Sequence, residues 1–119
     1  MRDSPKNVHN QIFGKQGESA ACRYLKKRGY KILKRNYKTP FGEADIIAFR
    51  RGVYAFVEVK ARETDAFGLP SEAVTREKQR RYRTIAQYFC MALGEEVPVR
   101  FDVASYYGGD IEYFENAFV

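Results

Sequence analysis

A carboxylate and an ammonium group interrupt what otherwise reads as a buried strand, in the segment FVEVKAR from Phe56 to Arg62. Side chains alternate between the two faces of a strand, so Glu58 and Lys60 are expected to share a face. Taken alone, E-x-K is a very weak motif, and an incidental ion pair at a solvated strand end explains it. A second carboxylate beside Glu58 would favour a functional interpretation.

Asp45 is the candidate for that second carboxylate. The segments EADIIAFR and VYAFVEVKAR each predict a strand, and Gly52 favours a tight turn between them. If Arg51 and Gly52 form a two-residue loop, Asp45 lies directly opposite Glu58 in the hairpin. A three-residue loop would place the two carboxylates on opposite faces. The hairpin register therefore decides whether these residues can act together.

Two carboxylates opposed in this way would repel each other by about 4 kcal/mol at an effective dielectric constant of about 20. Protonation of one carboxylate, a cation between them, or the ammonium group of Lys60 could relieve that repulsion. Carboxylate oxygens together with a backbone carbonyl and water form the oxygen-rich environment that suits Mg²⁺ or Mn²⁺. The sequence therefore predicts a divalent-cation site.

Further helices and strands on either side of the hairpin would position these residues. Apolar and small residues at helical spacing predict a first helix from about Asn10 to Arg28, after a flexible lead-in over residues 1–10. YKILKRNY predicts a strand before the hairpin and VPVRFDVASYY a strand near the end. Between them, Ser71 is a candidate N-cap for a helix that runs to about Leu93. IEYFENAF fits either an edge strand or a terminal tail.

The order helix, three strands, helix, strand predicts one α/β domain over residues 11–119, in which a small mixed sheet is flanked by helices. Cys22 and Cys90 lie far apart, which favours reduced thiols over a zinc site. We expect a cytoplasmic protein, because residues 1–11 lack the apolar core of a signal peptide and no apolar run is long enough to span a membrane. Arg100 and Asp102, in RFDV, are expected to form a structural ion pair.

The net charge of +6 and the isoelectric point near 9.4 favour contact with phosphate polymers or acidic membranes. The second predicted helix carries a dense basic run, which either forms an ordinary solvated face or contacts phosphates without reading sequence. Within it, Lys78 falls on the apolar stripe, where it would extend to solvent or pair with the carboxylates. The predicted nucleic-acid contacts are Arg62, Lys78, Gln79, Arg80 and Arg81, and a second basic group comprises Lys26, Lys27, Arg28, Lys31, Lys34 and Arg35.

Several motifs in a fixed order resemble the YraN-like family of bacterial proteins. They are GKQGESAACRYLKKRGYKILKRNYKTPFGEADIIAF, VEVKAR, FGLP, a lysine in the second helix and RFDV, and they extend from Phe13 to Val103. That family is grouped with archaeal-type Holliday-junction resolvases in the PD-(D/E)xK nuclease superfamily. The resemblance implies a restriction-endonuclease-like αβββαβ core. It also implies a metal-dependent, structure-recognising endonuclease that acts on DNA, branched DNA included, and that works as a homodimer.

The resemblance also implies roles for individual residues. Asp45 and Glu58 match the metal ligands of the superfamily, and Lys60 matches its catalytic lysine. Glu18 matches a helix glutamate that joins the site in resolvase-like members. The polar position on the second helix is matched by Lys78 or Gln79, whereas Ala44 departs from the proline or bulky aliphatic residue that is common before the aspartate.

In such a site, a metal ion held by Asp45, Glu58 and the backbone carbonyl of Val59 would lower the pKa of a bound water. Lys60 would orient or deprotonate that water and offset developing negative charge. Two alternatives remain at this point. One is a nucleic-acid-binding or adaptor module on the same fold with weak or no catalysis, and the other is a protein-interaction module whose acidic residues are structural.

Overall fold

The computed structural model describes residues 5–62 and 74–118, with the side chains of the first helix described from Gly14 onward. The elements are α1 (Pro5–Lys27), β1 (Lys31–Thr39), β2 (Gly42–Arg50), β3 (Val53–Ala61), α2 (Arg76–Leu93), β4 (Val99–Tyr107) and β5 (Asp110–Phe114). Their order confirms the prediction, and the segment after β4 forms an edge strand. None of the helices in this described part of the chain is both long and apolar enough to cross a membrane.

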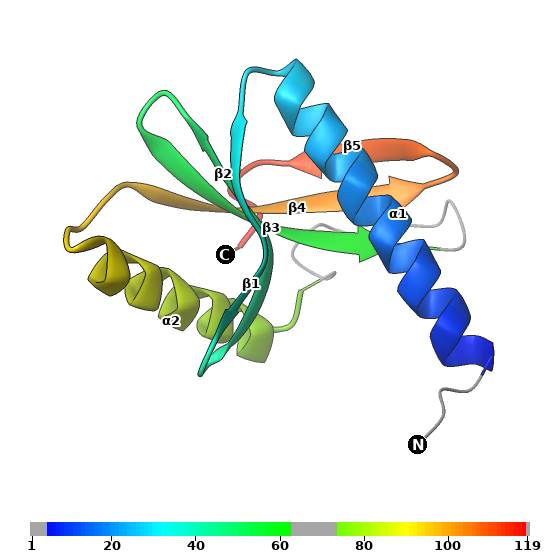
Figure 1. Ribbon diagram of the computed structural model, residues 1–119, viewed down its shortest axis with the longest axis horizontal. Coiled ribbons are helices and arrows are strands. Elements are labelled where there is room, and N and C mark those ends of the chain that lie inside the picture. The colour runs from blue at the N-terminus through cyan, green and yellow to red at the C-terminus, as the bar shows by residue number, and fades with distance from the viewer. Residues whose placement is uncertain (1–4, 63–73, 119) are drawn as a thin grey trace.

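The strands form one mixed sheet in the order β1-β2-β3-β4-β5. Strands β3 and β4 are parallel, and the other neighbours are antiparallel. A parallel pair needs a crossover connection, which here contains α2. The predicted α/β class with a small mixed sheet flanked by two helices is therefore confirmed (Figure 1).

The two helices cover opposite faces of the sheet, because successive side chains of the central strand β3 point in opposite directions. Phe56 packs in a cluster with Tyr82, Ile85 and Phe89 of α2. Its neighbour Val57 packs in a second cluster with α1 residues, which include Ala21 and Leu25. The apolar stripe predicted from the sequence for this helix comprises Val74, Lys78, Tyr82, Ile85, Ala86, Phe89 and Leu93. It is confirmed for its buried apolar members but is wrong for Leu93, which is exposed in the last turn of α2.

Close packing of α1 against the sheet depends on Gly17. A Cβ atom at this position would lie 3.3 Å from both the Tyr106 Cβ and the Val59 Cγ1. The absence of a side chain therefore lets the middle of α1 approach the ends of β3 and β4, where the predicted site residues lie.

The two helices begin at other residues than predicted. Helix α1 begins at Pro5, five residues before the expected start at Asn10. Helix α2 begins at Arg76, and its N-cap is Thr75, whose side chain accepts a hydrogen bond from the Lys78 backbone N–H at 3.2 Å. The predicted N-cap at Ser71 is therefore wrong, and Ser71 itself lies outside the described residues. Gly94 ends α2 in the left-handed conformation, as expected.

A two-residue turn joins β2 to β3. Arg51 and Gly52 both have positive φ angles, 52° and 81°, which is the combination found in type I′ hairpin turns. The ladder runs from Arg50 opposite Val53 to Ile46 opposite Val57. This is the register that the two-residue loop predicted.

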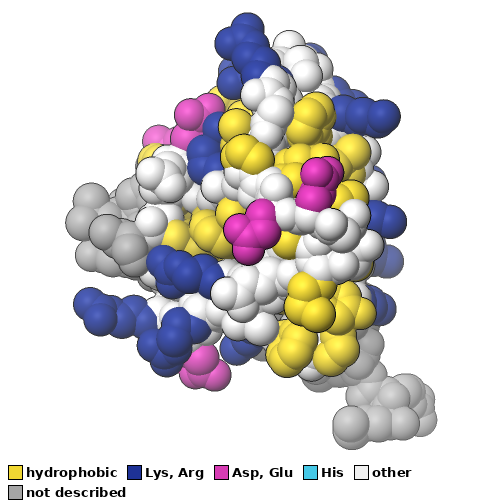
Figure 2. All heavy atoms as spheres, turned by 90° about the vertical axis from the view of Figure 1, so that its left-hand side faces the viewer, with side chains coloured by type: hydrophobic (Ala, Val, Ile, Leu, Met, Phe, Trp, Pro, Cys, Tyr) yellow, Lys and Arg dark blue, Asp and Glu magenta, His cyan; other side chains and the backbone are white. Residues whose placement is uncertain are grey.

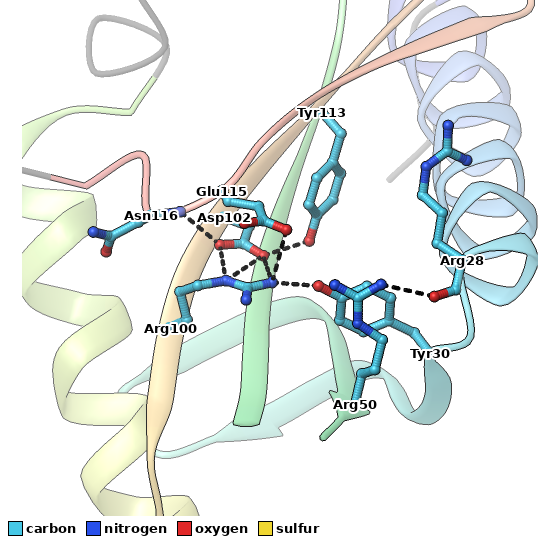
Figure 3. Close-up of polar contacts among 8 residues, drawn as sticks. All are labelled: Arg28, Tyr30, Arg50, Arg100, Asp102, Tyr113, Glu115 and Asn116. Carbon is cyan, nitrogen blue, oxygen red and sulfur yellow. Dashed lines mark hydrogen bonds and ion pairs between the residues drawn. The ribbon is translucent and has the colours of Figure 1, made fainter. Parts of the chain in front are cut away.

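Asp102 fastens the start of β4 to the chain that follows β5. Its fully buried carboxylate accepts hydrogen bonds from the Arg100 guanidinium, the Tyr113 hydroxyl and the backbone N–H of Asn116 (Figure 3). Buried carboxylates are stable only when they are paired in this way. The predicted structural ion pair between Arg100 and Asp102 is confirmed.

Candidate functional site

Asp45 and Glu58 meet just beyond the last paired residues of the hairpin. The ladder ends at Ile46 and Val57, and the next residue on each strand is a carboxylate. Asp45 Oδ2 accepts a hydrogen bond from the Val59 backbone N–H at 2.7 Å, so the aspartate bridges the two strands where the ladder stops. The prediction that the register brings Asp45 and Glu58 together is confirmed.

Helix α2 holds the side chain of Glu58. Only 4% of this residue is exposed, and each of its carboxylate oxygens has its own donor. The Tyr82 hydroxyl donates to Oε1 at 2.7 Å, and the Lys78 ammonium group donates to Oε2. The Tyr82 hydroxyl also accepts a hydrogen bond from the Asp45 backbone N–H at 3.2 Å. Tyr82 thus links both strands of the hairpin to α2.

Lys78, and not Lys60, neutralises Glu58. The Lys78 side chain is 38% exposed, yet its ammonium group reaches the buried carboxylate. Of the two alternatives for Lys78, the pairing with the carboxylates is the one observed. Lys60 follows Glu58 by two residues on the same face of β3, lies beside Ser105 of β4, and is exposed to solvent.

Burial raises the pKa of Asp45 to about 7, and the nearby charge of Glu58 is the next largest cause. The hydrogen bond from Val59 opposes this pKa rise, whereas the charge of Glu18 and a hydrogen bond with Glu58 add to it. The same burial, together with the charges of Glu58 and Asp45, raises the pKa of Tyr82 well above its usual value. Tyr82 is therefore a neutral donor, and Asp45 is partly protonated near neutral pH.

Glu18 lies on α1, within electrostatic reach of the two carboxylates. Its pKa is raised mainly by burial, with smaller contributions from the charges of Glu43 and Glu58. A hydrogen bond from the Asn36 side chain and the charge of Arg35 lower that pKa. The structure therefore places Glu18 near the predicted site, with Asn36 as its hydrogen-bond partner.

The donor set for a divalent cation is small. Within residues 5–62 and 74–118, no three His, Cys, Asp or Glu side chains gather closely enough to hold a metal ion. Asp45 and Glu58 would therefore be the only side-chain ligands from these segments. The N–H and C=O groups of one strand residue point to the same neighbouring strand, so the Val59 carbonyl faces the β2 side, as its N–H does.

These oxygen donors fit a hard divalent cation. Burial and the neighbouring charge of Glu58 both disfavour the ionised form of Asp45 and raise its pKa, and a bound cation would favour that ionised form. Asp45, Glu58 and the Val59 carbonyl are the groups that would hold it, with water completing the coordination.

Residues 17–105 match the family model described as "Uncharacterised protein family UPF0102". The chain belongs to this family. The predicted resemblance to the YraN-like family is thereby confirmed, since UPF0102 and the YraN-like family are the same group.

Relatives in the UPF0102 family are similar over almost their whole length. The UPF0102 protein of Thermodesulfovibrio yellowstonii is 47% identical over 106 residues, which are 89% of this chain and 95% of that protein. The one from Desulfosudis oleivorans is 47% identical over 111 residues, or 91% of this chain and 90% of that protein. The one from Caldicellulosiruptor saccharolyticus is 43% identical over 118 residues, or 93% of this chain and 100% of that protein.

Two of the predicted nucleic-acid contacts of this UPF0102 member are exposed on α2. Arg80 and Arg81 both face solvent, and Arg81 forms a 3.5 Å pair with Glu77 one helical turn earlier. The Arg81 side chain also crosses Gly42, where a Cβ atom would collide with it. This contact holds the basic face of α2 close to the beginning of β2.

Two other predicted contacts have structural partners. Gln79 is only 5% exposed, and its amide donates to the Val74 carbonyl at 3.1 Å, so it fastens the segment before α2 and does not present its side chain to a ligand. This placement differs from the predicted nucleic-acid contact. Arg62 donates to the Ser105 hydroxyl at 2.8 Å and lies 3.7 Å from Glu112, which fixes its guanidinium at the end of β3.

Tyr82 is the site residue that the sequence interpretation missed, because it was assigned to the apolar core. One signal could have found it. Lys78 and Tyr82 are four residues apart and therefore lie on the same face of α2. A lysine on an apolar stripe needs a buried partner, and the same partner is within reach of a tyrosine hydroxyl one turn later.

A separate hollow of about 830 Å³ lies between the second half of α2 and the start of β4. It is lined largely by apolar residues, among them Val99 and Phe101, and Met91 at its edge is 80% exposed. On the face that Figure 2 shows, hydrophobic side chains gather in several patches among Lys and Arg side chains. The hollow contains none of the predicted site residues.

Proposed function

We propose that this UPF0102 protein is a metal-dependent, structure-recognising endonuclease that hydrolyses phosphodiester bonds in DNA, with branched DNA as the substrate class. The observation that carries this proposal is the pair of adjacent carboxylates at the end of the β2–β3 hairpin, where the pKa of Asp45 is raised to about 7. Lys78 neutralises Glu58, but no basic side chain in the described part of the chain pairs with Asp45, and a protein that only binds DNA has no evident use for this second, buried carboxylate beside the first.

The order of elements supports the placement in the PD-(D/E)xK superfamily. Helix, three strands, helix and strand is the order of the restriction-endonuclease-like αβββαβ core, to which this chain adds the edge strand β5. The carboxylates lie side by side on the second and third strands, with Lys60 two residues after Glu58. This arrangement is expected of an active site of that superfamily, although fold alone does not determine activity.

In phosphodiester hydrolysis, each of these residues would have a separate role. Asp45, Glu58 and the Val59 carbonyl would hold Mg²⁺ or Mn²⁺, which lowers the pKa of a bound water and stabilises charge on the phosphoryl oxygens. Lys78 and Tyr82 fix the orientation of Glu58 through one hydrogen bond to each oxygen. Exposed Lys60 would hold the attacking water and offset charge on the phosphate.

The charge distribution supports DNA as the polymer that binds. The net charge is +6. The exposed arginines of α2 lie on the same helix as Lys78 and Tyr82, which bind the Glu58 carboxylate. Contacts of this kind position a phosphate backbone without reading bases. Cleavage of two strands of a branched substrate would call for two copies of the site, so a homodimer belongs to the proposal.

A second candidate function is DNA binding or adaptor activity without cleavage. It is favoured by the engagement of both Glu58 oxygens by Lys78 and Tyr82. In that case Glu58 would be a structural group that secures α2 to the sheet.

Cleavage assays separate the two functions. Four-way junction, flapped and linear DNA would be incubated with the protein and Mg²⁺ or Mn²⁺, with Asp45→Asn and Lys60→Ala as test variants. Asp110→Asn, at an exposed position in β5, is the matched control. We expect metal-dependent cleavage that the control retains and both test variants lose. Salt-sensitive binding without cleavage by the unaltered protein would instead support the adaptor function.

A further inference from the structure

A polar cavity lies beside the end of α1, away from the carboxylates. Its volume is about 410 Å³, and it is lined by Tyr24, Arg28, Tyr30, Arg50, Tyr113 and Glu115. Arg50 is the last residue of β2, five residues after Asp45, so roughly 16 Å of strand separates the two sites. The contacts of Arg50 with Arg28 and Tyr30 place it on the α1 side of the sheet, whereas Glu58 contacts α2 on the opposite face.

Two arginines in this cavity are held in place without being neutralised. Arg28 donates to the Tyr24 carbonyl at 3.3 Å, and its guanidinium carbon lies 3.4 Å from the centre of the Tyr24 ring. Arg50 donates to the Arg28 carbonyl at 2.8 Å and lies over the Tyr30 ring at 4.4 Å. Neither arginine pairs with a carboxylate in the part of the chain that the structure describes. Since a guanidinium has five N–H donors, most donors of both arginines remain available.

The nearest fully buried carboxylate is already committed elsewhere. Asp102 accepts hydrogen bonds from Arg100, Tyr113 and Asn116, so its charge balances Arg100. Arg100 also donates to the Tyr30 hydroxyl, which leaves that hydroxyl's own proton free for an acceptor in the cavity (Figure 3).

The cavity therefore carries a positive charge that calls for an anion. Two arginines face one carboxylate, Glu115, which lies 3.8 Å from Arg100 and is 55% exposed. The last turn of α1 adds Lys26 and Lys27 nearby. Guanidinium groups match the oxygens of a phosphate with paired hydrogen bonds, and the Tyr24 and Tyr30 rings beneath Arg28 and Arg50 hold these guanidinium groups in place.

We propose that this cavity binds a phosphate group, supplied either by a nucleic-acid strand or by a free nucleotide, with Arg28 and Arg50 as the principal ligands. The inference goes beyond the proposed nuclease activity, because it needs neither a metal ion nor cleavage at Asp45 and Glu58. In the proposed enzyme it would hold a second segment of DNA on the side of the sheet opposite to Glu58.

The test is a titration of ¹⁵N-labelled full-length protein, in the presence of a chelator, with inorganic phosphate, thymidine 5′-monophosphate and a short single-stranded oligothymidylate. The arginine Nε–H resonances are the readout. Arg28 and Arg50 resonances are expected to shift together and to saturate. Saturation by phosphate and the mononucleotide alone assigns the site to free nucleotides, whereas tighter binding of the oligonucleotide assigns it to a strand.

Matched variants distinguish specific phosphate binding in this cavity from nonspecific electrostatic attraction of the anion to a basic surface. Arg28→Gln should weaken binding by about tenfold, which corresponds to about 1.4 kcal/mol. Arg50→Lys, which keeps the charge and can still donate to the Arg28 carbonyl, should also weaken binding because it loses the fork geometry. Arg23→Gln, an equal change of charge at an exposed position of α1, should change the affinity less than about twofold. Unshifted Arg28 and Arg50 resonances, or equal weakening by Arg23→Gln, would overturn the proposal.

Discussion

The hydroxyl group of Tyr82 connects both strands of the hairpin to α2. The hydroxyl joins the Glu58 carboxylate of β3 to the Asp45 backbone of β2, and the ring packs against Phe118 with centroids 5.5 Å apart. A buried carboxylate oxygen and a buried N–H would both lose their partner if the hydroxyl were removed. The side chain therefore supports both the stability of the hairpin end and the geometry of the site.

Tyr82→Phe is expected to lower the free energy of unfolding by about 1–3 kcal/mol, because it removes one hydroxyl from two buried partners without opening a large cavity. Urea unfolding measures this loss. Tyr107→Phe, at an exposed position, is the matched control and should change the free energy of unfolding by less than about 0.5 kcal/mol. Equal stabilities of the two variants would show that the Tyr82 hydroxyl bonds contribute nothing net.

The carboxyl group of Asp45 should make stability depend on pH in the metal-free protein. Its pKa is raised from 3.8 to about 7 in the folded protein, so between these values the folded state binds more protons than the unfolded state. The resulting stabilisation is complete below about pH 4 and is lost as the pH rises through about 7.

This dependence can be measured by urea unfolding across that pH range, with Asp45→Asn as the comparison. The variant should lack the decline, and Mg²⁺ should reduce it in the unaltered protein by favouring the ionised carboxylates. A carbon-13 titration of Asp45 with a midpoint near its ordinary value would contradict the assignment.

At the scale of elements, hairpin β2–β3 was predictable because a local signal and a chemical one agree. The Arg51-Gly52 turn sets the register, and that register is the one that joins Asp45 to Glu58. The start of α2 was not predictable in the same way. Serine and threonine are both good N-caps, so local preference cannot choose between Ser71 and Thr75.

The role of Tyr82 could not be predicted from the sequence either, for a different reason than the start of α2. Helical periodicity shows that its ring faces the core, but not that its hydroxyl meets a carboxylate brought there by a separate hairpin. Gln79 shows the converse case, since its polar side chain suggested a ligand contact and is instead buried against the Val74 carbonyl. Both depend on tertiary packing between α2 and the sheet.

Removal of the N-cap tests the observed start of α2. Thr75→Ala should destabilise the protein by about 1 kcal/mol, because the side chain accepts the Lys78 N–H, whereas Thr75→Ser should be close to neutral. Thermal unfolding compares the two. Equal stability of the alanine and serine variants would place the beginning of the helix elsewhere.

At the scale of the whole molecule, the buried charges and the exposed charges have different partners. Buried carboxylates Glu58 and Asp102 are each neutralised by one basic residue, on opposite faces of the sheet. The excess positive charge is left to exposed arginines and lysines. This division allows the protein to attract a phosphate polymer while its buried carboxylates are balanced by basic partners inside the fold.

DNA binding should therefore be steep in salt and insensitive to sequence. Replacement of Arg80 and Arg81 by glutamine is expected to lower the slope of log K against log salt by about 1 for each phosphate that the variant no longer binds, and to weaken binding to all sequences alike. Fluorescence anisotropy at several salt concentrations measures the slope. An unchanged slope would remove the α2 face from the DNA-binding surface.

The central question is whether the carboxylates of the hairpin act on DNA. The most direct measurement is the rate at which a labelled four-way junction is cut with Mg²⁺ or Mn²⁺ by the unaltered protein, Asp45→Asn and Asp110→Asn. We expect metal-dependent cleavage that Asp110→Asn retains and that Asp45→Asn lowers by at least about a hundredfold, because one of the two carboxylates that hold the cation is removed. Cleavage at equal rates by all three proteins would contradict the assignment of the active site to Asp45 and Glu58.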